Sequence, residues 1–121
     1  DIRCTGPTQP TRRLSGGNQQ KVCIARALTL EPQVLFVSEP TRGIDIGAKK
    51  LVLDFLVNLN EQHGITIVMT SSELAELRSV CDRIAIIYGG KSVGIFKPDD
   101  PDETYGLAMA GSLSANAKGA K

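Results

Sequence analysis

Hydrophobic residues recur along this chain in two patterns, one with helical spacing and one continuous. Helical spacing over residues 19–30 and again from about 46 to 63 predicts two helices. Continuous apolar runs at 34–37 and 65–70 predict strands that are buried on both faces. Strands that alternate with helices indicate an α/β domain with a mostly parallel sheet. The second helix is predicted to turn one apolar face to the core, formed by Leu51, Val52, Phe55, Leu56 and Leu59.

Proline, glycine and serine indicate where the helices begin and end. Pro32 should end the first helix, because proline cannot continue a helix and restricts the residue before it. Gly64 should end the second helix. Ser71 and Ser72 are expected to cap a third helix that runs to about residue 81.

The last third of the chain predicts a small hairpin and a helix. Residues 83–88 and 91–96 are predicted strands, and the glycine pair between them is typical of a tight turn. One short helix is expected at about 103–110. Residues 112–121 are small and polar, which predicts a disordered tail.

Composition excludes several classes of protein. A chain of 121 residues is one domain at most, and 14 Lys and Arg against 13 Asp and Glu leave no charge excess for nucleic acid or an anionic membrane surface. The 3 cysteines form no CxxC pair, which favours reduced thiols over a disulfide framework or a metal site. No apolar run approaches a transmembrane span, and no signal peptide is recognised.

The segment LSGGNQQK, residues 14–21, carries the most informative local chemistry. Ser15, Gly16 and Gly17 directly precede the first predicted helix. Glycine lets a backbone approach a ligand closely, and a helix N-terminus offers free N–H groups and partial positive charge to an anion. Ser15 adds a hydroxyl that can donate to a phosphate oxygen. For an isolated Ser-Gly-Gly, a plain helix cap is the better interpretation.

A carboxylate follows the first predicted strand in the segment VLFVSEPTRGID, residues 34–45. Ligands of open α/β sheets bind just beyond the carboxyl ends of the strands, where Glu39 is expected to lie. A carboxylate there can orient a water molecule for attack on a γ-phosphate. The alternative is a solvated glutamate that opens a turn before Pro40.

LSGGNQQK closely resembles the signature motif of ABC ATPases, and VLFVSEPTRGID resembles their Walker B segment and D-loop. The resemblance implies that Ser15, Gly16, Gly17 and Asn18 contact ATP held by the opposite nucleotide-binding half.

The same resemblance implies that Glu39 is the catalytic glutamate and Asp45 the D-loop aspartate. It also implies a partial P-loop NTPase domain that lacks the Walker A strand, because no GxxxxGK[ST] phosphate loop occurs in the sequence.

Two positions depart from the family pattern. Ser38 occupies the place of the aspartate that helps to hold Mg²⁺, and a neutral hydroxyl is a poor substitute for a carboxylate near that cation. Ser72 occupies the place of the switch histidine, and a plain helix cap is at least as good an interpretation of it. His63, the only histidine, is assigned a structural role before Gly64. No metal ligand is predicted.

Three segments resemble the second ATPase half of bacterial simple-sugar importers of the ribose, galactose and xylose type. They are LSGGNQQKVCIARAL, EPTRGIDIGAK and TSSELAEL. That resemblance implies a C-terminal portion of a nucleotide-binding domain over residues 1–111. It also implies ATP and Mg²⁺ as cofactors, and a location at the cytoplasmic face of the inner membrane. The implied partners are a transmembrane permease, the first ABC half of the same chain and, indirectly, a solute-binding protein.

Two other functions stay open at this stage. One is a non-hydrolysing interaction module that keeps only dimer geometry and signature donation, which the serines at positions 38 and 72 favour. The other is a soluble ABC ATPase in DNA repair or translation, which the balanced charge disfavours. The family's Walker A strand would lie between the 65–70 and 83–88 strands. The unpaired edges left by its absence are expected to cause self-association, rearranged strand pairing or a partly ordered monomer.

Overall fold

The computed structural model describes residues 2–113, which form two compact units. Unit 1 is Asp1–Ser72 and unit 2 is Glu73–Lys121. Residues 114–121 of the predicted tail lie outside the described residues. Among the described residues, no helix is long and apolar enough to cross a membrane.

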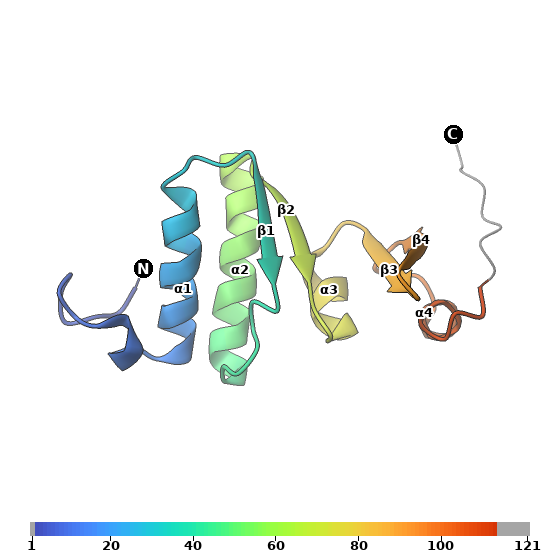
Figure 1. The fold of residues 1–121 in the computed structure, drawn as a ribbon, viewed down its shortest axis with the longest axis horizontal. Helices are drawn as coiled ribbons and strands as arrows, with labels where there is room; N and C mark the ends of the chain where they lie inside the picture. Colours follow the sequence, from blue (N-terminus) through green and yellow to red (C-terminus); the bar gives the residue numbers. More distant parts are fainter. Residues whose placement is uncertain (1, 114–121) are drawn as a thin grey trace. The chain divides into compact units, whose positions relative to one another are not determined.

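Unit 1 is a two-stranded parallel sheet with two helices (Figure 1). A short 3₁₀ turn precedes α1, and β1 and β2 each follow a helix of the unit. Val34 pairs with Thr66 at one end of the ladder and Ser38 with Thr70 at the other, so the two strands end together. The elements are η1 (Thr11–Arg13), α1 (Gly16–Leu28), β1 (Val34–Ser38), α2 (Ile46–His63) and β2 (Thr66–Thr70).

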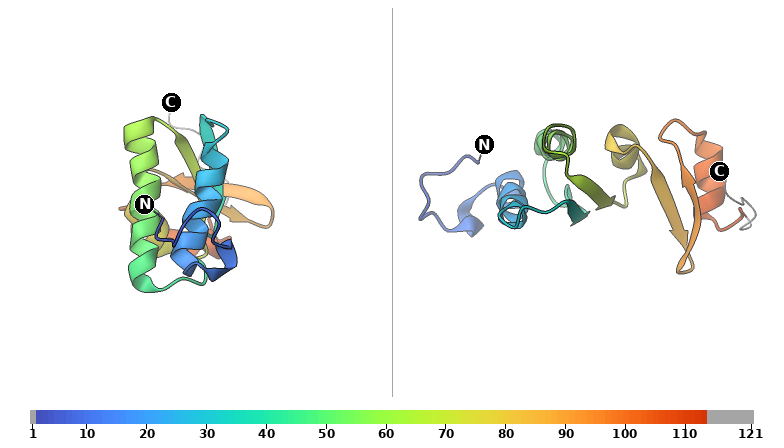
Figure 2. Two further views of the ribbon diagram at one scale, coloured as in Figure 1. Left: turned by 90° about the vertical axis from the view of Figure 1, so that its left-hand side faces the viewer. Right: turned by 90° about the horizontal axis from the view of Figure 1, so that it is seen from above.

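The core of unit 1 lies between the two helices and one face of the sheet. Its buried members are Ile24 of α1, Leu35 of β1, and Val52, Leu56 and Leu59 of α2. Figures 1 and 2 show α1 and α2 side by side. Burial of these side chains holds α2 firmly against the sheet.

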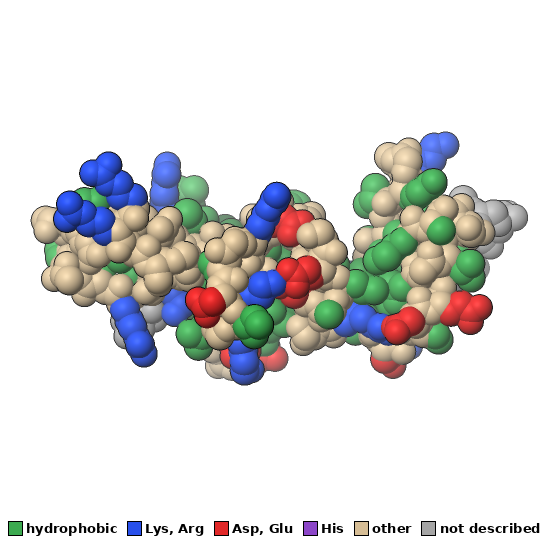
Figure 3. All heavy atoms as spheres, turned by 90° about the horizontal axis from the view of Figure 1, so that it is seen from below, with side chains coloured by type: hydrophobic (Ala, Val, Ile, Leu, Met, Phe, Trp, Pro, Cys, Tyr) green, Lys and Arg blue, Asp and Glu red, His purple; other side chains and the backbone are tan. Residues whose placement is uncertain are grey.

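The prediction that both strands are buried on both faces is wrong for this chain. The second face of the sheet exposes Val34, Phe36 and Val68, with Phe36 76% exposed. Continuous apolar runs predict strands covered on both sides, but no described element of unit 1 covers this face. Figure 3 shows hydrophobic side chains at the surface in both units.

The helices of unit 1 correct the predicted ends in detail. α1 begins three residues early, at Gly16, because Ser15 already caps it, and it ends at Leu28, before the proline. α2 has the predicted bounds, and Gly64 ends it in the left-handed conformation with φ 65°. The predicted apolar face was wrong at Leu51, which is 57% exposed. Leu53 is buried in its place.

Unit 2 is a β-hairpin packed with two short helices. Its elements are α3 (Leu74–Val80), β3 (Ile84–Tyr88), β4 (Lys91–Phe96) and α4 (Asp102–Met109). The predicted hairpin and last helix are both present, and the glycine pair of the turn has φ of 55° and 74°. The buried core consists of Ile84, Ile86, Tyr105 and Ala108.

The predicted cap of the third helix is wrong. α3 begins at Leu74, its N-cap position is Glu73, and no side chain caps it. Ser72 instead points its hydroxyl to Glu39, so its hydrogen bond goes to another part of unit 1. Within the described residues, β1–β2 and β3–β4 are two separate sheets.

Sequence reasoning did not find the polar cluster around Arg78, which organises unit 2. The Arg78 guanidinium donates to the carbonyl of Pro98 at 2.6 Å, to the carbonyl of Asp100 and to the carboxylate of Asp102. It also lies 4.9 Å from the centre of the Tyr105 ring. These contacts tie α3 to α4 and to the loop before it, which supports the fold rather than a ligand site.

Candidate nucleotide-contact site

The start of α1 is held in place by its own side chains. The Ser15 hydroxyl accepts from the backbone N–H of Asn18 at 3.4 Å and from its side-chain amide at 3.0 Å. The carbonyl of that amide in turn accepts from the N–H of Arg3 at 3.2 Å. The Gln19 amide donates back to the carbonyl of Leu14 at 2.8 Å. The hydrogen bonds that cap α1 therefore join Ser15 and Asn18, the first and last residues of the predicted phosphate-facing loop.

This arrangement leaves backbone donors at the start of α1 without a carbonyl partner in the helix. The first N–H groups of an α-helix have no partner within the helix, and Gly16 and Gly17 occupy these positions. Ser15 uses its oxygen as an acceptor, so its own O–H is able to donate to an anion. A phosphate group fits this donor set, because N–H groups and the helix dipole both favour negative charge there.

The two glycines also lie against the start of α2. A Cβ built on Gly16 would lie 2.8 Å from Cγ2 of Ile44, and one on Gly17 would lie 2.9 Å from Cβ of Ala48. Both distances are shorter than carbon atoms tolerate. This contact joins the predicted signature motif to the predicted D-loop, and nothing in the spacing of the sequence indicates it.

Asp45 is the N-cap of α2. Its Oδ1 accepts from the backbone N–H of Ala48 at 2.9 Å, in the extended conformation typical of capping residues. The predicted D-loop aspartate therefore also has a structural role as a helix cap. Its position in the sequence, after a loop and directly before a predicted helix, is a signal for that role.

Ser38, Glu39 and Ser72 meet at the carboxyl ends of β1 and β2, the edge where Glu39 was expected to lie. The Thr70 hydroxyl donates to the Ser38 hydroxyl at 3.0 Å, and the Ser72 hydroxyl donates to Oε2 of Glu39 at 3.3 Å.

Glu39 has an unusual backbone. Its φ of 47° lies in the left-handed region that residues with a Cβ rarely adopt. Its N–H donates to the carbonyl of Thr70 at 2.8 Å, and its carbonyl accepts from the N–H of Arg42 at 3.1 Å. The following Pro40 and Thr41 are fully buried. Strained residues held in this way are concentrated at functional sites.

The residues of this cluster do not fit a Mg²⁺ ion held by protein groups alone. Glu39 is the only carboxylate of the cluster, and the hydroxyl in the aspartate position is paired with Thr70. No group of three or more His, Cys, Asp or Glu side chains able to hold a metal occurs among the described residues. Mg²⁺ is usually held by one or two carboxylates together with substrate phosphates.

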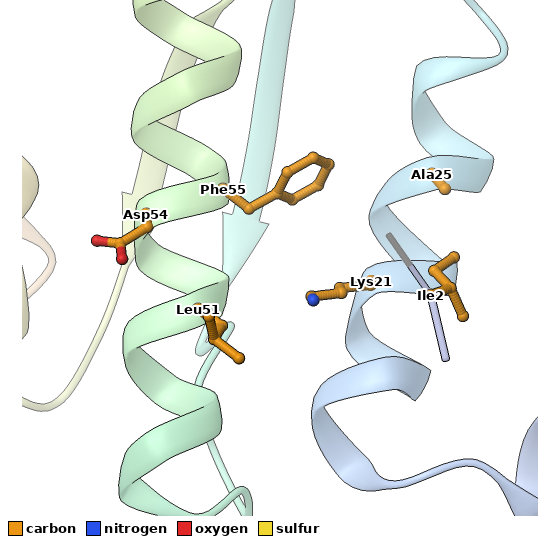
Figure 4. Close-up of a pocket in the computed structure, with 6 residues that line it drawn as sticks. All are labelled: Ile2, Lys21, Ala25, Leu51, Asp54 and Phe55. Atoms are coloured by element: carbon orange, nitrogen blue, oxygen red, sulfur yellow. The ribbon is translucent and has the colours of Figure 1, made fainter. Parts of the chain in front are cut away.

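A pocket of about 430 Å³ lies between α1 and α2, away from the predicted site residues. Figure 4 shows Phe55 pointing from α2 toward α1 and Lys21 pointing from α1 toward α2. The lining residues are Ile2, Lys21, Ala25, Leu51, Asp54 and Phe55. None of its lining residues is one of the predicted site residues.

Relatives of this chain are ATP-binding proteins of importers. Residues 2–42 match the family model described as ABC transporter. The ribose import ATP-binding protein RbsA of Halalkalibacterium halodurans is 43% identical over 102 residues, which are 84% of this chain and 20% of that protein. The protein of the same name in Bacillus cereus is 41% identical over 110 residues, 91% of this chain and 22% of that protein. The chain thus spans about a fifth of the length of these relatives.

Solved structures confirm the predicted fold class. A dimeric ATP-binding cassette in a post-hydrolysis state, bound to ADP and phosphate, is 32% identical with a TM-score of 0.63, over 72% of this chain and 37% of that chain. CbiO1 of Clostridium perfringens, part of an ABC transporter complex, is 28% identical with a TM-score of 0.70, over 84% and 39%. The described residues have part of the fold of an ATP-binding cassette, and over most of its length the chain is similar to the ATP-binding proteins of ABC transporters.

Proposed function

We propose that this chain is part of the second nucleotide-binding half of a sugar-type ABC importer, with residues 1–111 as the C-terminal portion of that domain. Its role is to lend Ser15, Gly16, Gly17 and Asn18 to ATP held on the phosphate loop of the first half of the same protein. The observation that carries this proposal is the start of α1, where a capping serine and two glycines leave N–H and O–H donors without a partner in the helix.

In this function the chain supplies positioned donors, and ATP supplies the phosphate that they bind. The N–H groups of Gly16 and Gly17 and the Ser15 hydroxyl would hold the γ-phosphate. Asn18 would keep Ser15 oriented, because its amide and its N–H both donate to that hydroxyl. Donors fixed before the ligand arrives stabilise developing charge without the cost of reorganisation.

Binding across two halves would close them, and closure would be passed to a transmembrane permease at the cytoplasmic face of the inner membrane. A solute-binding protein would supply the sugar to that permease. The names of the relatives concern ribose import, which supports a sugar as the transported solute.

For the site that Glu39 itself faces, we propose weak or no hydrolysis. Glu39 would orient a water molecule, and the Ser72 hydroxyl donates to one of its oxygens. The Ser38–Thr70 hydroxyl pair, however, replaces a carboxylate that would help to hold Mg²⁺. This observation favours the second candidate function, a half that donates its signature motif and does not hydrolyse ATP at its own site.

The test compares three variants in a full-length importer ATPase that carries this segment. Ser15→Asp keeps a good N-cap but places a negative charge against the γ-phosphate, so α1 should stay folded while ATPase activity falls about 100-fold. Ser15→Thr keeps both the cap and the hydroxyl and serves as the matched control. Glu39→Gln should reduce activity much less, because the site that it serves is already degenerate.

Each outcome decides one part of the proposal. Normal ATPase activity in Ser15→Asp would show that the signature loop does not contact the nucleotide. A loss in Glu39→Gln as large as that in Ser15→Asp would show that this half is catalytic in its own right. Binding of ATP to the first half, measured by equilibrium dialysis, should be unchanged in all three variants.

A further inference from the structure

We infer that Ala48, on the first turn of α2, is a positioning residue for the signature loop, and that it acts through direct contact with Gly17. This inference rests on the proposed function, because the position of Gly17 matters only if its N–H contacts the nucleotide. It gives a second reason why position 17 is glycine: a Cβ there would collide with α2, in addition to any collision with a ligand.

The contact itself is close and buried. Gly17 is buried, and a Cβ placed on it would lie 2.9 Å from the Cβ of Ala48. Its neighbour Gly16 meets Ile44 in the same way, at 2.8 Å. Only a residue without a Cβ allows the start of α1 to approach α2 this closely.

Ala48 is itself held from two sides. Its N–H donates to Asp45 Oδ1 at 2.9 Å, which fixes the first turn of α2. One turn further along the helix, Val52 is completely buried against the sheet. The Cβ of Ala48 therefore presents a surface that does not yield easily, and the first turn of α1 rests on it. A displacement of the D-loop would move the outward N–H groups of the signature loop with it.

A glycine at position 17 has two explanations, and a double variant separates them. If the space is needed for Ala48, Gly17→Ala should be harmful alone and rescued when Ala48→Gly removes the opposing Cβ. If the space is needed for the nucleotide, removal of a Cβ on the far side cannot restore it. Gly17→Asp would change packing and charge together, so it would not distinguish contact with Ala48 from contact with the nucleotide.

The first measurement is the thermal midpoint of the 121-residue chain in the two single variants and the double variant. Alanine is favoured over glycine within a helix, so Gly17→Ala should raise the midpoint if no contact opposes it. The contact predicts a lower midpoint, and it predicts that the double variant is more stable than the sum of the two single changes. Gly106→Ala, in α4, is the matched control, because nothing lies within 4 Å of a Cβ there and its midpoint should rise.

The second measurement is ATPase activity in the full-length importer ATPase. Gly17→Ala should lower kcat about tenfold or more, because a small misplacement of a binding group is costly, and Ala48→Gly should restore most of that loss. The KM for ATP, set mainly by the first half, should change little. A merely structural role would lower stability without this rescue of kcat.

The outcomes distinguish this inference from the proposed function. Failure of Ala48→Gly to rescue either the midpoint or kcat overturns the positioning role and leaves signature donation intact. A raised midpoint in Gly17→Ala also overturns it. Rescue of the midpoint together with kcat that is normal in every variant, Gly17→Ala included, would keep the packing contact, reject the positioning role and count against signature donation.

Discussion

Asp45 caps α2 in the structure and is also the predicted D-loop aspartate, and one pair of substitutions is able to separate the two roles. As the N-cap of α2 it accepts the N–H of Ala48 at 2.9 Å. Loss of such a cap costs about 1 kcal/mol, within a range of about 0.5–2 kcal/mol. Because 1 kcal/mol shifts the thermal midpoint of a domain of this size by roughly 4–8 °C, we expect Asp45→Ala to lower the midpoint of unit 1 by about that amount.

Asp45→Asn is the matched control. Asparagine caps helices about as well as aspartate, so only the favourable effect of negative charge at the helix start is lost, about 0.3–1 kcal/mol at an exposed position. The N–H of Ala48 should exchange its hydrogen faster in Asp45→Ala than in Asp45→Asn. Any loss of ATPase activity that both variants share in the full-length protein would then belong to the carboxylate and not to the cap.

The assay is circular dichroism for the midpoint and amide hydrogen exchange for the single N–H group. Equal midpoints in wild type and Asp45→Ala would show that the cap contributes nothing. Equal losses in Asp45→Ala and Asp45→Asn would show that the charge matters and the hydrogen bond does not. Either result would refute the assignment of Asp45 as a structural cap.

Four further predictions follow from the sequence and the two units. The isolated chain should show no micromolar binding of ATP with Mg²⁺ by calorimetry, because its sequence contains no phosphate loop. Leu56→Ala should cost about 2–5 kcal/mol in urea unfolding, whereas Leu51→Ala, at an exposed position, should cost less than about 0.5 kcal/mol. Burial, aided by Asp82, raises the pKa of the Cys81 thiol above its ordinary 9.0, and burial raises the pKa of Tyr105 above 10.0 although Arg78 opposes this. As pH rises, the unfolded chain loses the protons of Cys81 and Tyr105 before the folded chain does. The free energy of unfolding should therefore be unaffected by these groups below pH 9 and should fall as pH rises through their higher folded-state pKa values. The unfolding midpoint measured across alkaline pH checks this, and a constant midpoint would contradict it. The isolated chain should self-associate in sedimentation velocity, and Val68→Lys on the exposed face should reduce this association; a monodisperse wild-type monomer would disprove it.

Local patterns predicted most of the fold of this chain. Helical spacing located α2 to the residue, and the glycine pair located the hairpin turn, because both depend on conformational preferences within a few residues. The position of Glu39 beyond the carboxyl end of β1 was also predicted, since ligand-facing residues of open α/β sheets lie at that edge.

The errors lie where distant contacts decide the outcome. Ser72 is a good helix cap by residue type, yet its hydroxyl donates to Glu39, 33 positions earlier in the chain. Phe36 belongs to an apolar run that predicts burial, yet it is exposed, because no described element of unit 1 packs on that face of the sheet. A short apolar run shows that a strand can be buried on both faces, but it does not show which elements pack on those faces.

The sequence by itself predicted the resemblance to ABC ATPases, the signature loop and the order of the elements, because motifs and periodicity are local properties of the chain. Only the tertiary structure decided why positions 16 and 17 are glycine within the chain itself: the side chains of Ile44 and Ala48 lie there. These pairs are about thirty residues apart in sequence, and such a close approach arises from the packing of α1 and α2 against one sheet. The spacing of residues along the chain predicts which side chains lie on each face of a helix, whereas the tertiary structure decides which residues those faces contact.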